Sequence, residues 1–196
     1  MSIKLFISQP MRDKTDEEIL AEREKAIKAV STIFGYDDVK VINSFFQDVP
    51  HDAKPLWYLG ESIKMLGYAD VAYFCEGWDD YRGCQMEHKA SEDYGIQIIE
   101  ALPKVYNSSY TLSNDNELML NKARELVAKW YNENTEFKIT KDYVLIVWFC
   151  KTLQNWKAIC STTIHDKRIC EITHNGDKNE TYLDVYLKES NNRYEG

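Results

Sequence analysis

The stretch DVAYFCEGWDDYRGCQMEHKASEDYGIQII, residues 70–99, decides the fold class. Its first six residues form an apolar run that predicts a buried strand. Residues 83–94 predict a helix that ends at Gly95, and residues 96–99 predict the next strand. A strand, a helix and a strand in this order are typical of two parallel strands joined by a right-handed crossover.

The sequence before residue 70 repeats this alternation. Strands are predicted at 3–8 and 39–44, and helices at 15–35 and 55–67. Thr15 and Glu18 form a capping-box signature at the start of the first helix. Residues 1–102 therefore predict an α/β domain, with a Rossmann-like parallel sheet flanked by helices on both faces.

The composition changes after Pro103, and residues 103–114 predict a linker. Residues 115–135 predict an amphipathic helix. Strands are predicted behind it at 143–153, 155–164, 168–174 and 181–189. Residues 115–196 therefore predict a small α+β domain with one helix and an antiparallel meander. Its excess of apolar residues favours packing on the first domain or on a second copy, so we expect an accessory or oligomerisation domain and a homo-oligomer.

Charge and composition restrict the partners. The 196 residues are 44% hydrophobic and 13% aromatic, which is enough for a packed core. The formal net charge of -8 argues against polymeric DNA or RNA, because binding them requires a basic surface. No apolar stretch has the length of a membrane span and no secretory signal is visible, so we expect a cytoplasmic protein without a membrane partner.

The cysteines indicate reduced thiols, because there are five of them and no CxxC pair. The spacing of Cys160, His165, Cys170 and His174 fits no common zinc pattern, and thiols packed on strand faces are the simpler interpretation. We therefore expect no metal and no cofactor.

Ligands of parallel α/β sheets bind at the carboxyl ends of the strands, and residues 8–14, 44–54 and 76–83 follow such ends. Glu87 lies just behind the last of these segments. We expect it in the first turn of a helix, where the helix dipole favours the ionised form. An ionised carboxylate at this edge is able to attack C1′ of a nucleoside, as in retaining glycosyl transfer. The alternative is an acid that only complements the helix dipole.

Other polar and aromatic side chains near these ends are candidates for ligand contacts. Acids would hold sugar hydroxyls and manage the proton of a leaving base, aromatic rings would stack on the base, and arginines would hold a phosphate. The alternatives are turn-forming acids, rings that cover the core, and solvated arginines. The candidates are Asp70, Asp79, Asp80, Trp78, Tyr81, Arg12 and Arg82.

Three features carry a family resemblance: LFISQPM (5–11), Asp70, and DDYRGCQMEHKA (79–90), in which Gly-x-x-x-Glu is followed by Ala at +3. In these features residues 3–99 resemble the nucleoside 2-deoxyribosyltransferase-like superfamily, and more closely an uncharacterised branch of phages and their bacterial hosts. The resemblance implies that Glu87 is the nucleophile, with Asp70 and either Asp79 or Asp80 as sugar- and base-handling acids. It also implies that residues 8–11 line the floor of the ligand site. Together with the candidates above, the expected ligand-binding residues are Ser8, Gln9, Pro10, Met11, Arg12, Trp78, Tyr81, Arg82 and Gly83. The C-terminal half resembles a small uncharacterised family of phage and Firmicute domains.

Three functions fit these features. An enzyme would bind a nucleoside or nucleotide and cleave or transfer its N-glycosidic bond, as an N-ribosyl or deoxyribosyl hydrolase or transferase. A phage-type anti-defence sponge would sequester an ADP-ribose-like immune signalling nucleotide without turnover. Gln9 in place of the family's glycine and a shortened loop between Asp70 and Glu87 favour the sponge. The third possibility is a structural module with a vestigial pocket.

Overall fold

The computed structural model describes residues 2–35, 38–46, 50–101, 114–190 and 192. The chain divides into two compact units, Met1–Tyr106 and Asn107–Gly196. The predicted linker 103–114 lies outside the described residues, apart from Asn114. None of the described helices combines the length and the apolar character that crossing a bilayer requires.

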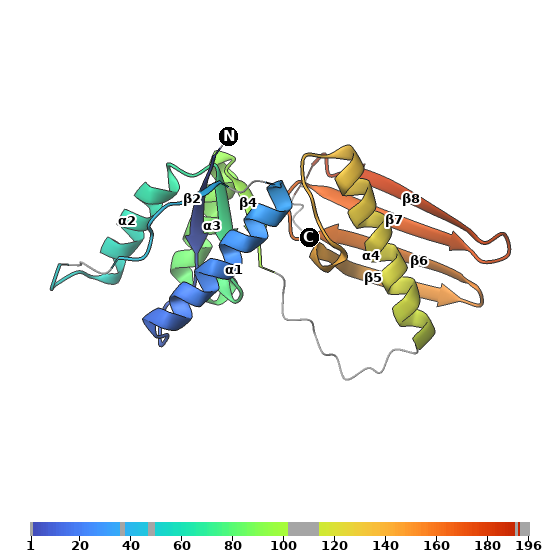
Figure 1. Ribbon diagram of the computed structural model, residues 1–196, viewed down its shortest axis with the longest axis horizontal. Helices are drawn as coiled ribbons and strands as arrows, with labels where there is room; N and C mark the ends of the chain where they lie inside the picture. Colours follow the sequence, from blue (N-terminus) through green and yellow to red (C-terminus); the bar gives the residue numbers. More distant parts are fainter. Residues whose placement is uncertain (1, 36–37, 47–49, 102–113, 191, 193–196) are drawn as a thin grey trace. The chain divides into compact units, whose positions relative to one another are not determined.

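The N-terminal unit is built around a four-stranded parallel sheet with the order β2-β1-β3-β4. Its strands are β1 (Ile3–Ser8), β2 (Val39–Val41), β3 (Val71–Phe74) and β4 (Gln97–Glu100). Its helices are α1 (Asp16–Phe34), α2 (Pro55–Leu66) and α3 (Arg82–Tyr94), with the short 3-10 helix η1 (Trp78–Asp80). Right-handed crossovers place α1 on one face of the sheet and the contacting pair α2 and α3 on the other (Figure 1). The predicted α/β class is confirmed.

Local sequence signals explain the boundaries of these elements. Thr15 and Glu18 form both bonds of the predicted capping box at the start of α1. Gly95 ends α3 in the left-handed conformation, with φ of 71°. The strand predicted at 39–44 stops at Val41, because Asn43 and Ser44 use their side chains to bond nearby backbone groups in place of a further ladder.

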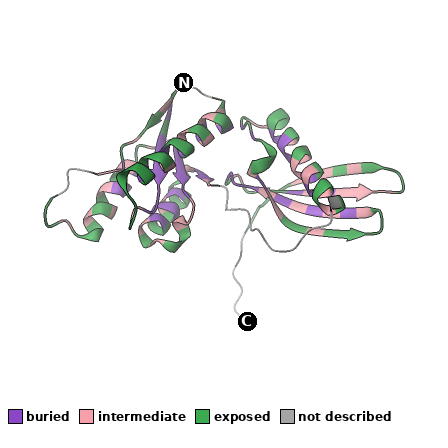
Figure 2. Cartoon of the chain, turned by 60° about the horizontal axis from the view of Figure 1, so that its bottom comes forward, coloured by how far each residue is buried: buried purple, intermediate pink, exposed green. Residues whose placement is uncertain are grey.

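The two faces of the parallel sheet bury different sets of residues. Phe6, Ala72, Phe74 and Ile98 pack with Leu66 of α2 in one cluster. The alternate side chains of β1, including Leu5 and Ile7, are also buried and face α1. Figure 2 shows the buried residues gathered along the central strands, with exposed residues on the outer sides of the helices.

The C-terminal unit is an antiparallel meander with the order β5-β6-β7-β8, preceded by α4 (Asn114–Asn134) and the short η2 (Lys141–Tyr143). Its strands are β5 (Val144–Thr152), β6 (Asn155–Thr162), β7 (Arg168–Asn175) and β8 (Glu180–Leu187). Figure 1 shows α4 crossing one face of this sheet, which agrees with its contacts to β5 and β6. Cys160 and Cys170 lie opposite each other on β6 and β7 and are buried. Burial raises their pKa values to about 12 and about 11, so both are packed thiols.

Candidate functional site

Two serines hold a buried side-chain carboxyl group at the C-terminal ends of the parallel strands, which we call the carboxyl edge of the sheet. Ser8, the last residue of β1, donates a 2.5 Å hydrogen bond from its hydroxyl to Oε2 of Glu87. Ser62 of α2 donates a second one, also of 2.5 Å, to Oε1. We call Ser8, Ser62 and Glu87 the carboxyl cluster. It joins a strand and two helices, so its geometry is fixed by the packing of the whole unit.

The position of Glu87 differs from the predicted one. Helix α3 begins at Arg82, so Glu87 is its sixth residue and lies in the second turn, where the helix dipole is weak. Only 7% of the residue is exposed, and this burial raises the pKa of its carboxyl above the ordinary value. The hydroxyls of Ser62 and Ser8 oppose the rise, because their bonds favour the ionised form. Burial therefore acts against the ionised form, which the helix dipole was predicted to favour.

The two serine bonds do not use all the acceptor sites of the carboxyl group. A carboxylate has about four lone-pair sites on its two oxygens, and the serines use one on each oxygen. The hydroxyls therefore fix the orientation of the group without saturating it. Such a carboxyl is able to act as a nucleophile when ionised, as an acid when protonated, or as an acceptor for ligand hydroxyls.

A thiol close to the cluster does not share this chemistry. Cys84 is buried, and burial raises its pKa to about 11, although a hydrogen bond with Ser8 lowers it. The thiol is therefore neutral at physiological pH and is not a nucleophile. Glu87 is the reactive group that the described geometry favours at this edge.

Asp70 lies at the opposite edge of the sheet, where the parallel strands begin. It precedes β3, and its Oδ2 accepts a 2.9 Å hydrogen bond from the backbone N–H of Lys4 near the start of β1. Ser8 pairs in register with Phe74, at the far end of β3. The strand β3, roughly 13 Å long at 3.3 Å per residue, therefore separates Asp70 from the carboxyl cluster. The structure does not bring this predicted acid together with Glu87.

The loop after β3 is folded onto the core of the unit. Gly77 takes φ of 75° and leads into η1, where Trp78 stacks on His88 with ring centroids 4.0 Å apart and planes 5° apart. The indole also meets Phe74 edge-on, at 5.4 Å. One face of the Trp78 ring is therefore occupied by a side chain of α3. This matches the alternative in which the loop aromatic covers the core.

The remaining predicted residues follow β1 and β3 in the chain and are buried to different degrees. Gln9 and Pro10 are buried and Met11 is half-buried. Tyr81 and Gly83 are half-buried at the start of α3. The predicted acids of the loop and both predicted arginines are exposed to solvent: Asp79, Asp80, Arg12 and Arg82.

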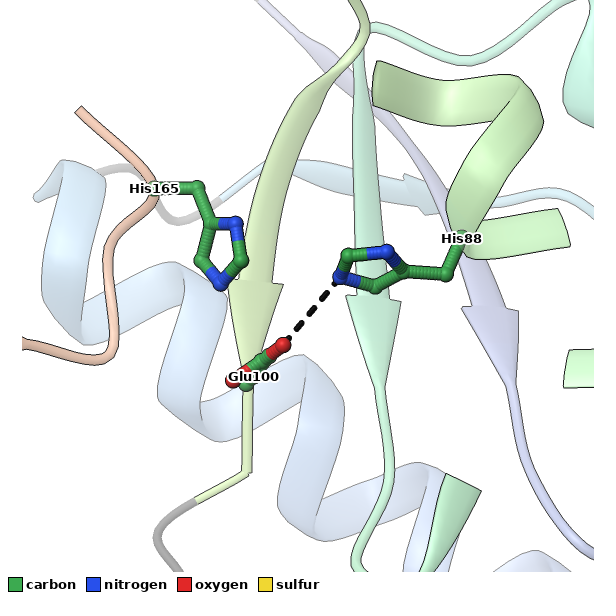
Figure 3. Close-up of side chains that lie close together, drawn as sticks. All are labelled: His88, Glu100 and His165. Carbon is green, nitrogen blue, oxygen red and sulfur yellow. Dashed lines mark hydrogen bonds and ion pairs between the residues drawn. The ribbon is translucent and has the colours of Figure 1, made fainter. Parts of the chain in front are cut away.

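Sequence reasoning missed two parts of this region. Ser62 lies four residues before Leu66, and both are on the buried side of α2. The sequence signal for Ser62 was therefore a small hydroxyl residue on an apolar helix face. His88 follows Glu87 and is also buried, and its Nε2 lies 3.1 Å from Oε1 of Glu100, the last residue of β4 (Figure 3). No sequence motif links these two residues, because the link depends on the pairing of α3 with β4.

In comparisons with known proteins, the C-terminal part of the chain matches an uncharacterised family. Residues 120–196 match the family described as "Family of unknown function (DUF6275)". A conserved protein of Enterococcus faecalis V583, known from a crystal structure, aligns over 71% of this chain and 82% of its own length, at 13% identity and a TM-score of 0.40. No curated protein matches the chain significantly. The family match agrees with the prediction that the C-terminal half is a domain of an uncharacterised kind.

Proposed function

We propose that the N-terminal unit binds a nucleoside or nucleotide at the carboxyl edge of its parallel sheet and cleaves or transfers the N-glycosidic bond. The observation that carries the proposal is the carboxyl cluster: a buried glutamate, oriented by two hydroxyls, at the edge where α/β sheets bind their ligands. The resemblance of residues 3–99 to the nucleoside 2-deoxyribosyltransferase-like superfamily supports the same role for Glu87.

The reaction proceeds in two displacements. The ionised carboxylate of Glu87 attacks C1′ of the sugar, the bond from C1′ to the base nitrogen breaks, and the base leaves with the bonding electrons and takes up a proton. Asp79 or Asp80 supplies that proton from the loop after β3. Water or a second base then attacks C1′ and gives its proton to the same aspartate, and the bond from C1′ to Glu87 breaks, which gives a hydrolase or a transferase. Ser8 and Ser62 stabilise the carboxylate before the first displacement and again when the second displacement releases it.

The raised pKa of Glu87 favours a second candidate, binding without turnover. A protonated carboxyl is not a nucleophile, but it both donates to and accepts from ribose hydroxyls. In this form the protein would sequester an ADP-ribose-like nucleotide, as a phage anti-defence protein does. The packing of Trp78 on His88 and the distant position of Asp70 also reduce the set of residues that assist catalysis.

One experiment separates the two candidates. The full chain and its Glu87→Gln variant are incubated with nucleosides, nucleoside monophosphates and ADP-ribose derivatives, and both the released base and the intact bound ligand are quantified. Glu92→Gln is the matched control, because Glu92 lies on the same helix and is exposed. An enzyme loses at least about a thousandfold in rate with Glu87→Gln and nothing with the control.

A sponge gives a different result in the same experiment. The wild type then returns the ligand intact, and Glu87→Gln weakens binding by only about 1–3 kcal/mol, because the amide retains one acceptor. Base release that is equally fast in wild type and Glu87→Gln contradicts the nucleophile assignment. Absence of both release and binding across the panel leaves only the vestigial module.

A further inference from the structure

A buried positive charge lies on the other side of β1 from the carboxyl cluster. Arg23 of α1 is only 6% exposed, although it is an arginine in a helix rich in exposed charged residues. It follows Ile19 by four residues, so it lies on the same buried side of α1 as Ile19, Ala26 and Val30. Its guanidinium therefore faces the sheet near the ends of β1 and β2.

The partners of this guanidinium are neutral. Nη1 donates a 3.2 Å hydrogen bond to the hydroxyl of Ser44, and Nη2 donates a 3.3 Å bond to the backbone carbonyl of Ile42. The Ser44 hydroxyl in turn donates to the carbonyl of Ile7, at 3.0 Å. Among the described residues, no acidic side chain forms an ion pair with Arg23.

A buried charge without a counter-ion is costly, by several kcal/mol for an ion of this size. Burial accordingly lowers the pKa of Arg23, although an arginine remains charged at physiological pH. The guanidinium has five donors, and two of them are used by the neutral partners. The remaining donors, and a charge that no described acid compensates, match an anion that binds from outside the chain.

A buried acceptor near Arg23 also lacks a partner among the described residues. Gln9 is 5% exposed, and its Nε2 donates a 3.3 Å bond to the carbonyl of Ile19, one helical turn before Arg23. Within the part of the chain that the structure describes, its Oε1 has no hydrogen-bond partner. Buried acceptors are almost always satisfied, so a donor is missing at this place. The charged guanidinium of Arg23 and the unsatisfied Oε1 of Gln9 thus lie near the same turn of α1.

We propose that Arg23, Ser44 and Gln9 form an anion subsite that binds a phosphate group of the ligand, with Arg23 holding the phosphate and Gln9 Oε1 accepting from a ligand hydroxyl. The identity of the anion rests on the proposed function, in which the ligand is a nucleoside or nucleotide. Ser8 and Gln9 are adjacent and their side chains bond to opposite sides of β1, toward Glu87 and toward α1. The sugar and the phosphate of one ligand would therefore lie on either side of the end of β1, and the preferred substrate class is the nucleotide.

Calorimetry on the full chain tests the subsite with adenosine, adenosine 5′-monophosphate and inorganic phosphate as probes. We expect the monophosphate to bind about 10–150-fold more tightly than the nucleoside in the wild type, as charge-assisted hydrogen bonds imply. Arg23→Met should reduce this ratio to about one. Lys28→Met is the control, because it removes a positive charge from an exposed position of the same helix and should leave the ratio unchanged.

The outcomes separate the subsite from the proposed function. Inorganic phosphate that binds the wild type but not Arg23→Met, while neither adenosine nor its monophosphate binds, supports the subsite and contradicts the proposed ligand. Tight monophosphate binding with the same ratio in wild type and Arg23→Met overturns the subsite alone. Nitrogen NMR of the Arg23 side chain in the wild type covers the case in which the variant does not fold. A phosphate-dependent shift supports the subsite, and an unmoved signal overturns it.

Discussion

Burial raises the pKa of Glu87 and the hydroxyl of Ser62 opposes the rise, so removal of this hydroxyl should have a measurable signature. In Ser62→Ala, Oε1 of Glu87 loses its donor while the bond from Ser8 to Oε2 remains. The Ser62 bond favours the ionised form of the carboxyl, so its loss should raise the pKa of Glu87 further. The variant changes no charge, and it removes one oxygen atom from a buried side chain.

The size of the shift follows from the difference between two kinds of hydrogen bond. A bond to a charged acceptor contributes about 1.5–3 kcal/mol and a bond to a neutral one about 0.5–1.5 kcal/mol. The ionised form of Glu87 therefore loses about 1–1.5 kcal/mol more than the protonated form when the donor is removed. At 1.36 kcal/mol per unit, the pKa of Glu87 should rise by about one unit.

The shift also changes how stability depends on pH. The pKa of Glu87 is raised in the folded chain, so between the unfolded and folded pKa values the folded chain holds a proton that the unfolded chain has released. The free energy of unfolding therefore falls as pH rises through this window. In Ser62→Ala, the free energy of unfolding should continue to fall up to a pH about one unit higher than in the wild type. If Glu87 is the nucleophile, the rate should rise with pH through the same window, because only the ionised form attacks.

Carbon NMR of glutamate labelled at the side-chain carboxyl measures the pKa directly, with Glu87→Gln to assign the signal. Urea unfolding at a series of pH values measures the stability. Ser91→Ala is the matched control, because its buried hydroxyl bonds the backbone carbonyl of Glu87, at 2.8 Å, and not the carboxyl. The reasoning is refuted if Ser62→Ala leaves the pKa of Glu87 unchanged, or if Ser91→Ala raises it as much.

Two further substitutions test the positions of predicted site residues. Asp70→Asn keeps an acceptor for the backbone N–H of Lys4, so the free energy of unfolding should change by less than about 1 kcal/mol and any turnover should be retained; a loss of turnover as large as that of Glu87→Gln would return Asp70 to the site. Trp78→Ala removes the ring that stacks on His88 and meets Phe74, so urea titration should show a loss of about 2–4 kcal/mol; a change within about 0.5 kcal/mol would mean that the ring adds little to the core.

Much of the fold was predictable because short signals determine it locally. The alternation of apolar runs with capped amphipathic segments gives the order of strands and helices, and a parallel sheet follows from that order. The capping box at Thr15 and the left-handed glycines mark helix ends with few residues. The strand predicted at 39–44 was too long, because the sequence does not show that Asn43 and Ser44 bond the backbone with their side chains.

The candidate site was predictable only in part. The edge that carries Glu87 follows from the direction of parallel strands, and the same argument places Asp70, which precedes its strand, at the other edge. The burial that raises the pKa of Glu87 was not predictable, because it depends on tertiary packing, which a helix position alone does not show. Arg23 lies four residues after Ile19 and so on the apolar side of α1, but an arginine within a charged helix favours the interpretation of a solvated side chain.

The carboxyl cluster also has a consequence for how the unit folds. Its two hydrogen bonds join residues 79 and 25 positions apart in the chain. Contacts of such high sequence separation form late, because the intervening helices and strands must first close their loops. A folding intermediate without a docked α3 therefore has no acceptor for the hydroxyls of Ser8 and Ser62. A ligand that engages the cluster, as the proposed function requires, would therefore stabilise the native state and no earlier species along the folding route.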